Sequence, residues 1–281
     1  MRKKIKSVEY RKCKNYYVQG RSKRLIIILL AAAMISNQSI AYAGAAGGDS
    51  GISDETLLKL AELPAADIFN VDFSIGADDQ SQLQNQLIQT TGSPEIAKDR
   101  ELNKNTASFN GRSAYTYSFG QGSHDKIRQN LTMECMVKFK DIQSGEHDFF
   151  SNQEYGGIGL GLNNGILTFF ANVDGSYRPP EAEVSANQWY HIAGVIDGKE
   201  VKLYVNGELK AVNTDAWNSG IQFPSSTDAW NMVLGGDITA DGNVDFLSNV
   251  DIGFARIYSD ALSDKQIRLM NEKAIDGTSV T

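Results

Sequence analysis

The sequence predicts an all-β fold in which antiparallel strands form a two-sheet sandwich, with short helices near its N- and C-terminal ends. The first observation behind this prediction is that residues 188–207 read as two strands joined by a tight turn. The second is a series of short segments in which apolar and polar residues alternate, separated by Gly, Asn and Asp. Short strands at this spacing are typical of a sandwich rather than of a parallel α/β sheet.

The hairpin in residues 188–207 carries the clearest turn chemistry. Asp197-Gly198 separates its two alternating halves, and Asn206-Gly207 follows the second half. Such pairs adopt the positive φ angles that tight hairpin turns require. His191 lies inside the first half, and we expect a hydrogen-bonded sheet residue there rather than a catalytic base.

The other elements follow in chain order. Ser53 is a candidate N-cap for a short helix that Pro64 stops, and Ser263 with Gln266 forms a capping box for a C-terminal helix. Residues 76–105 are polar and predict a surface excursion with weak structure. Further strands are expected at residues 66–73, 107–109, 114–118, 131–140, 148–151, 158–162, 166–172, 232–235 and 250–258.

The first 43 residues have the order of a secretory signal peptide. A basic stretch precedes the apolar run at residues 25–35, and Ala41-Tyr42-Ala43 is a small-x-small cleavage signal. A membrane anchor is the alternative, but the apolar run is eleven residues long, and a spanning helix needs about 20. We therefore expect a secreted, extracellular protein, either free or associated with the cell wall, with no membrane span after cleavage before Gly44.

The rest of the chain divides into three parts. Residues 44–65 are expected to be a linker with a short helix, residues 66–275 the β domain, and residues 276–281 a polar tail.

Charge and cysteine content exclude some classes of partner and chemistry. The chain carries a net charge of −7, and its leader holds ten Lys or Arg and one Glu, so the remainder stands at −16. An acidic surface repels phosphate backbones and attracts cations, which argues against nucleic acid as a partner. Outside the leader Cys135 is the single cysteine, and its place on an apolar strand face predicts an inert core thiol.

Several segments occur in the order of one known family. Besides the hairpin they are ASFNGRSAYTYS (residues 107–118), LTMECMVKF (131–139), VLGGD (233–237) and VDIGFARIYSDALSDKQI (250–267). This set resembles the LamG-like (laminin G type 3) domains of the concanavalin-A-like lectin/glucanase superfamily. Met136 and Gly253 depart from the family pattern, which usually has Trp and an acid there. The resemblance implies a concanavalin-A-like jelly roll, and binding rather than catalysis.

A narrower resemblance concerns residues 145–177, which are similar to the LamG-like module of secreted Gram-positive metallophosphoesterases. The histidine and aspartate motifs of a two-metal catalytic centre do not occur in the chain. A glycosidase needs paired carboxylates on one strand, and the nearest pair, Glu181 and Glu183, follows two prolines in an expected loop. We therefore predict no enzymatic activity.

The motif TDAWN occurs twice, at residues 214–218 and 227–231. Sugars stack on Trp faces while nearby Asn and Asp side chains bind hydroxyl groups. These motifs predict ligand contacts, whereas a Trp that caps the core beneath a long loop is the alternative. The predicted ligand-binding residues are Trp217, Trp230, Asp215 and Asn218.

A structural calcium ion (Ca²⁺) at the sandwich rim is implied by the resemblance, with Asp72 on the first strand and Asp251 on the last as ligands. Neither acid has a Lys or Arg within three residues, and an unpaired buried carboxylate is costly. The alternative metal site is the loop with Asp237, Asp241 and Asp245, whose oxygens suit a hard cation. A solvated acidic loop without metal is the other interpretation of that segment.

The predicted function is a secreted, non-catalytic binding module for a carbohydrate or cell-surface glycan. The alternative is a structural or protein-contact accessory domain detached from a secreted metallophosphoesterase. The sequence leaves the oligomeric state open.

Overall fold

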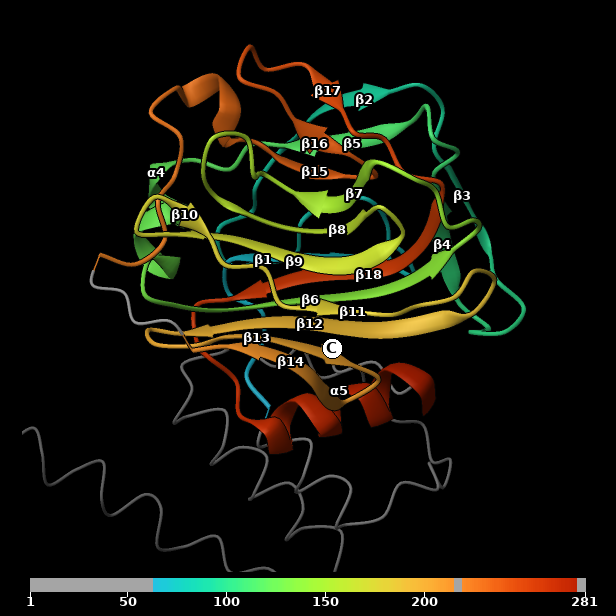
Figure 1. The fold of residues 1–281 in the computed structure, drawn as a ribbon. Coiled ribbons are helices and arrows are strands. Elements are labelled where there is room, and N and C mark those ends of the chain that lie inside the picture. Colours follow the sequence, from blue (N-terminus) through green and yellow to red (C-terminus); the bar gives the residue numbers. More distant parts are fainter. Residues whose placement is uncertain (1–62, 215–218, 277–281) are drawn as a thin grey trace, which may run out of the picture. The chain divides into compact units, whose positions relative to one another are not determined.

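The computed structural model of the chain describes residues 63–214 and 219–276 (Figure 1). The predicted signal peptide, and the linker and helix up to residue 62, lie outside the described residues. Within the two described ranges no helix is long and apolar enough to cross a membrane.

Two antiparallel sheets make up the domain, as predicted, and their strands run across the view in Figure 1. The first sheet holds strands that are far apart in sequence, because the last long strand inserts between the N-terminal strands and the hairpin. Its order is β14 (Glu208–Asn213), β13 (Val201–Val205), β12 (Trp189–Asp197), β6 (Asn130–Phe139), β18 (Val250–Tyr258), β4 (Asn105–Ser108) and β3 (Glu95–Lys98), and β1 (Phe69–Asp72) also pairs with β18.

The second sheet is built mainly from the middle of the chain. A separate two-stranded pair, β16 (Asp237–Ile238) and β17 (Val244–Asp245), packs through Ile238 and Val244 against Val233, apart from the main core. The order of the second sheet is β10 (Ser176–Tyr177), β9 (Ile166–Val173), β8 (Ile158–Asn163), β7 (Glu146–Ser151), β15 (Met232–Leu234), β5 (Ala114–Tyr117) and β2 (Leu87–Thr91), with β11 (Glu181–Ala182) also on β9.

The core lies between the two sheets, because alternate residues of each strand point inward. Cys135 on β6 is fully buried in this core, as predicted, and burial raises the pKa of its thiol. The sheets approach closely at Gly194 on β12, where an added Cβ would lie 2.6 Å from ring atoms of Phe169 on β9. Glycine is therefore the residue that fits opposite this aromatic ring.

The predicted hairpin is confirmed. β12 and β13 pair in the register Ile196 with Val201, and Gly198 in the turn has a φ of 79°. Asn206 and Gly207 have φ angles of 53° and 77°, so both adopt the left-handed conformation that the Asn-Gly pair favours.

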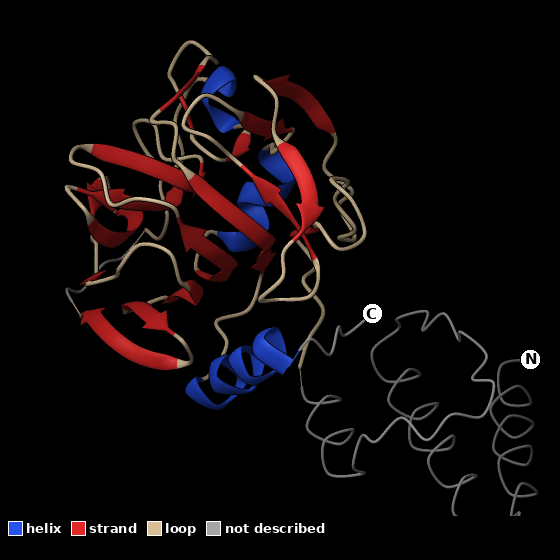
Figure 2. Cartoon of the chain, turned by 90° about the vertical axis from the view of Figure 1, so that its right-hand side faces the viewer, coloured by secondary structure: helices blue, strands red, loops and turns tan. Residues whose placement is uncertain are grey.

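Three helical segments lie among the described residues: α4 (Gln121–Ile127), the 3-10 helix η2 (Thr227–Trp230) and α5 (Asp264–Asp276). Figure 2 shows α5 outside the strands, at the lower edge of the view. Its predicted capping box is present, since the Ser263 N–H donates to Gln266 Oε1 at 3.0 Å and the Gln266 N–H to Ser263 Oγ at 3.4 Å. Ile267 and Met270 are buried against the outer face of the first sheet.

The prediction for residues 76–105 was wrong. This segment contributes β2 and β3, which form the outer edges of the two sheets. Their side chains are mostly exposed, so neither strand has a buried face that would produce an apolar alternation.

Candidate functional site

A surface of loops gathers beside the second sheet, and one of the predicted ligand residues belongs to it. Trp230 ends η2 and is half-buried. Its indole N–H donates to the carbonyl of Pro224 at 2.6 Å, and its ring meets that of His124 edge-on at 5.0 Å. The ring is thus partly a cap and partly accessible, which combines the two interpretations given for it. Trp217, Asp215 and Asn218 lie outside the described residues.

A cluster of buried and half-buried rings packs against Trp230. His124 on α4 is buried, and its imidazole stacks on Phe223 at 3.8 Å with an interplanar angle of 4°. Phe119 completes the stack at 5.4 Å from His124. Burial and, to a smaller extent, the positive charge of Arg128 lower the pKa of His124 to about 4. The imidazole is therefore neutral near pH 7 and serves as an aromatic support.

The loop between β7 and β8 contributes Tyr155, which sequence reasoning missed. Its side chain is 81% exposed, and its φ is 54°. The two residues that follow must be glycines, because a Cβ at Gly156 would lie 2.8 Å from the carbonyl oxygen of Gln222 and one at Gly157 would lie 2.0 Å from that of Asn152. The loop is thus pressed against its neighbours while the Tyr155 ring projects outward.

Tyr177 on β10 holds this loop in place. Its hydroxyl donates to the carbonyl of Gln153 and accepts from the N–H of Gly156 at 3.1 Å. The Asn152 side chain donates to the carbonyl of Trp230 at 3.2 Å, so the loop also contacts η2. We call Tyr155, Tyr177 and Trp230 the aromatic surface, and all three rings are at least partly exposed. A sequence signal for this surface is present: Tyr155 directly precedes Gly156-Gly157 between two predicted strands.

Acidic side chains border the aromatic surface. Glu154 precedes Tyr155, and burial together with Asp241 raises the pKa of the Glu154 carboxyl. Asp241 is exposed, and its carboxylate accepts from Thr239 Oγ1 at 2.5 Å and Asn243 Nδ2 at 2.7 Å. A Cβ at Gly242 would lie 3.5 Å from Cβ of Asp228, so this acidic turn adjoins η2. Glu154 and the Asp241 turn thus lie beside the segments that carry the aromatic surface.

The acids of the predicted loop site do not point to one place. Asp237 is 1% exposed and accepts from the N–H of Gln153 at 3.1 Å, whereas Asp241 and Asp245 are exposed. Burial raises the pKa of Asp237 to about 7. In the described part of the chain, no group of three or more His, Cys, Asp or Glu is arranged to hold a metal ion.

The premise of the Asp72–Asp251 calcium site was wrong, because each carboxylate has a cationic partner. Arg256 donates to Asp72 at 3.1 Å, and Lys140 lies 3.0 Å from Asp251. Ser74 adds two further hydrogen bonds to Asp72. Neither acid therefore depends on a metal for compensation of its charge.

His191 is a buried sheet residue, as predicted. Its Nε2 lies 2.8 Å from Glu134 Oε1, and the Tyr258 hydroxyl donates to Glu134 Oε2 at 2.8 Å. Burial alone would raise the pKa of Glu134, but the bond from His191 and the charge of Arg256 hold it below its usual range. The Glu134 carboxylate is thus ionised, and it is held by His191, Tyr258 and Arg256 on the outer face of the first sheet, which α5 covers.

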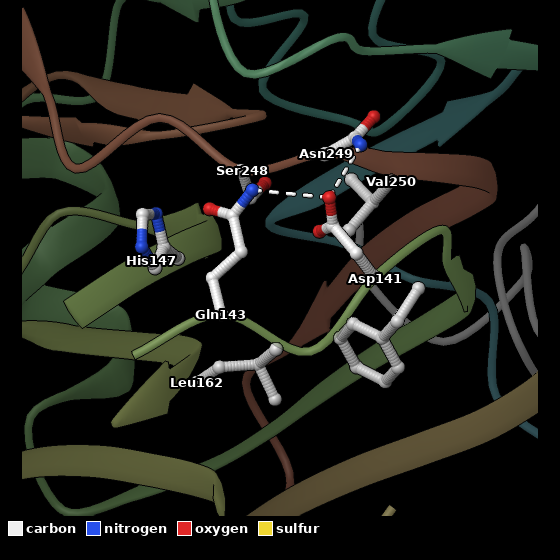
Figure 3. Close-up of a pocket in the computed structure, with 8 residues that line it drawn as sticks. Asp141, Gln143, His147, Leu162, Ser248, Asn249 and Val250 are labelled. Atoms are coloured by element: carbon white, nitrogen blue, oxygen red, sulfur yellow. Dashed lines mark hydrogen bonds between the residues drawn. The ribbon is translucent and has the colours of Figure 1, made fainter. Parts of the chain in front are cut away.

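A small depression lies at the rim between the sheets (Figure 3). Asp141 Oδ2 accepts from Gln143 Nε2 at 3.1 Å and from Asn249 Nδ2 at 2.9 Å, and His147 lies beside Gln143 (Figure 3). The depression encloses about 220 Å³, including space open to solvent. Enclosed small-molecule sites usually exceed about 300 Å³, so this depression is small for such a site.

The comparisons with known proteins agree with the fold. Residues 110–268 match the family model of the concanavalin A-like lectin/glucanases superfamily. The comparison with curated proteins found no match, and the likeness to the metallophosphoesterase module remains a prediction.

Among solved structures, similarity is found to binding domains of bacterial toxins. The receptor binding domain of the botulinum neurotoxin C/D mosaic serotype is 16% identical, with a TM-score of 0.58 over 74% of this chain and 51% of that one. The binding domain of botulinum neurotoxin DC, in complex with rat synaptotagmin II, is 11% identical, with a TM-score of 0.59 over 74% of this chain and 52% of that one. The binding domain of Paraclostridial Mosquitocidal Protein 1 is 15% identical, with a TM-score of 0.56 over 73% and 52%.

At these identities the similarity shows the fold alone, and the chain spans about half the length of the solved structures that it matches. The family model, in contrast, covers more than half of this chain, and its match runs from the loop before β5 into α5. The chain therefore belongs to the concanavalin A-like lectin/glucanases superfamily.

Proposed function

We propose that the domain is a non-catalytic binding module that acts outside the cell and takes a glycan on the aromatic surface. The observation that carries this proposal is Tyr155, an aromatic ring that is 81% exposed and stands on a loop fixed by Gly156, Gly157 and Tyr177. Single exposed apolar side chains are common on proteins, but this ring stands on a fixed loop that contacts both Tyr177 and Trp230, an arrangement that suits stacking against a ligand.

The chemistry of the surroundings suits sugars. Pyranose rings present C–H groups that pack on aromatic faces, while their hydroxyls donate to carboxylates and accept from amides. Glu154 and Asp241 supply carboxylates beside Tyr155, and Asn231 follows Trp230 at the half-buried end of η2. Trp217, Asp215 and Asn218 remain predicted contacts of the same ligand.

The structural neighbours support binding rather than catalysis. Each of the three solved structures described above is named as a binding domain, whereas the superfamily includes both lectins and glucanases. A surface of projecting rings favours a ligand that lies across it, such as a polymer chain.

The test is a glycan array probed with the purified chain, followed by calorimetry on the best-bound sugar. We expect Tyr155→Ala to weaken binding at least about fivefold, since stacking of one ring contributes on the order of 1 kcal/mol or more. Leu209→Ala is the matched control, because Leu209 is also an exposed apolar side chain but lies on β14 in the first sheet. It should leave the affinity unchanged.

Two results would contradict the proposal. One is an array with no bound glycan, and the other is a glycan whose affinity is unaffected by Tyr155→Ala and Trp230→Ala. If the array is empty while Tyr155→Ala abolishes capture of a protein partner, the protein-contact alternative is correct.

A further inference from the structure

A buried pair of acids lies behind the aromatic surface, with the Gln153 amide between them. Asp148 on β7 is 0% exposed, and Asp237 on β16 is 1% exposed. Gln153 joins the two, since its backbone N–H donates to Asp237 and its side-chain amide donates to Asp148 Oδ2 at 2.8 Å. The pair comes from distant parts of the sequence and converges only in the fold.

The adjacent strand is shaped to admit this pair. A Cβ at Gly161 on β8 would lie 1.9 Å from Asp148 Oδ1, and a Cβ at Gly159 would lie 2.3 Å from Ser151 Oγ and 3.4 Å from Cδ of Gln153. The two glycines thus leave a space above β8 that polar side chains fill. A strand in an ordinary core would use side chains at these positions to exclude water.

Negative charge accumulates around this space. Asp148 lies close enough to Asp237 and Glu146 for their charges to interact. Glu146 Oε1 accepts at 2.7 Å from the same Gln153 amide that donates to Asp148. The carboxylates therefore repel one another when they are ionised.

Two buried acceptor oxygens of the cluster, Asp148 Oδ1 and Gln153 Oε1, lack a hydrogen-bond partner among the described residues, as does the nearby hydroxyl of Ser151. Gln153 is 5% exposed. Buried polar atoms are nearly always hydrogen-bonded, because leaving one unsatisfied costs about 1–3 kcal/mol. Both orphan atoms are oxygens, which a cation can satisfy and another acceptor cannot.

We propose that Asp148, Asp237 and Gln153 Oε1 are ligands of a hard divalent cation of the calcium class, with Glu146 at the entrance. Hard cations take six to eight oxygens, and carboxylates, amide carbonyls and water all serve. Two carboxylates and one amide oxygen supply part of this shell, and water would have to complete it, because no group of three or more His, Cys, Asp or Glu in the described part of the chain is arranged to hold a metal ion. Glu146 is half-buried and connects the cluster to solvent. This proposal does not depend on the identity of any glycan.

The experiment is thermal unfolding of the full chain at pH 7.5 in calcium, in magnesium and in chelator. A cation that binds only the folded state at a hundredfold excess over Kd should raise the melting temperature by about 5–10 °C. Asp148→Asn should abolish the calcium shift. Asp251→Asn is the matched control, because it removes a carboxylate that already has Lys140 as its partner, and it should keep the shift.

A measurement on the wild type keeps the proposal testable if Asp148→Asn fails to fold. Terbium is a luminescent substitute for calcium, and Tyr177 lies beside Gln153, so excitation of tyrosine should sensitise terbium emission that calcium displaces. Equal melting in calcium and chelator, with no sensitised emission, would overturn the proposal and leave an acid pair that holds a proton instead. A calcium shift that survives Asp148→Asn but is lost in Asp251→Asn would also overturn it, and would return the site to Asp72 and Asp251.

Discussion

The carboxylate of Asp148 lies over Gly161, with Oδ1 1.9 Å from the position that a Cβ would take. The two residues are also Cα partners across β7 and β8. Any side chain at position 161 would therefore overlap the carboxylate and displace it. This relationship turns a glycine in a strand, which is normally destabilising, into a requirement of the fold.

Gly161→Ala should destabilise the protein by about 1–3 kcal/mol, because the added methyl group overlaps Asp148. Urea unfolding would measure the loss. Gly122→Ala is the control, since a Cβ there meets no atom within 4 Å and alanine favours the helix that contains it. Equal stability of the two variants would show that the Asp148 carboxyl can move aside freely.

Gly194→Ala should also lower the free energy of unfolding by about 1–3 kcal/mol, here because the added methyl group overlaps an apolar side chain. The new methyl group would lie 2.6 Å from ring atoms of Phe169 and would push the sheets apart. Phe169→Leu removes the ring, so the double variant should be more stable than the sum of the two single losses predicts. Strict additivity of the two free energies would contradict a direct contact.

Acid should destabilise the protein through His124. Its pKa falls from about 6.5 in the unfolded chain to about 4 in the folded one, so the unfolded state binds the extra proton between these values. The stability that this neutral imidazole contributes is present above pH 6.5 and is lost as the pH falls towards 4, by at most about 3 kcal/mol.

Denaturant unfolding at pH 7 and at pH 4.5 would check this dependence. His124→Phe keeps an aromatic ring in the stack between Phe119 and Phe223 but cannot take up a proton. It should lose less stability than the wild type over the same pH interval. If the free energy of unfolding falls equally in His124→Phe and in the wild type between pH 7 and pH 4.5, other groups dominate acid unfolding.

Glu134→Gln should destabilise the protein strongly, by about 3 kcal/mol or more, because it leaves Arg256 and the bond from His191 without the buried carboxylate. Glu208→Gln removes a carboxylate from an exposed pair with Lys210 on β14 and should cause no measurable change. Chemical unfolding of both variants at pH 7 would separate the buried network from the surface pair.

The fold could be predicted from the sequence because its long strands alternate and its turns carry Asp-Gly or Asn-Gly. On β6 the core-facing residues from Leu131 to Phe139 are apolar, whereas Thr132, Glu134 and Lys138 lie on the opposite face, which produces a strong period of two. β12 is buried on both faces, and its hairpin turn identifies it. β2 and β3 were missed because edge strands with exposed side chains leave no such period. Their pairing is decided by the neighbouring strands and not by local pattern.

The candidate site was much less predictable. Asp72 was expected to lack a cation because no basic residue is near it in sequence, yet the register that pairs Asp72 with Phe254 brings Arg256 beside it. Asp148 and Asp237 meet for the same kind of reason, across a gap that only tertiary structure closes. Local sequence can nominate an acid, but strand register decides which charge it faces.

The fixed backbone around Tyr155 has a consequence for the thermodynamics of recognition. Gly156, Gly157 and Tyr177 already hold the loop in one conformation, so a ligand has little chain entropy to remove on binding. What remains to be ordered is the rotamer of a single ring, a cost of about 0.5–1.5 kcal/mol. Association at this surface should therefore proceed without a slow conformational phase, and affinity should vary between ligands through their dissociation rates.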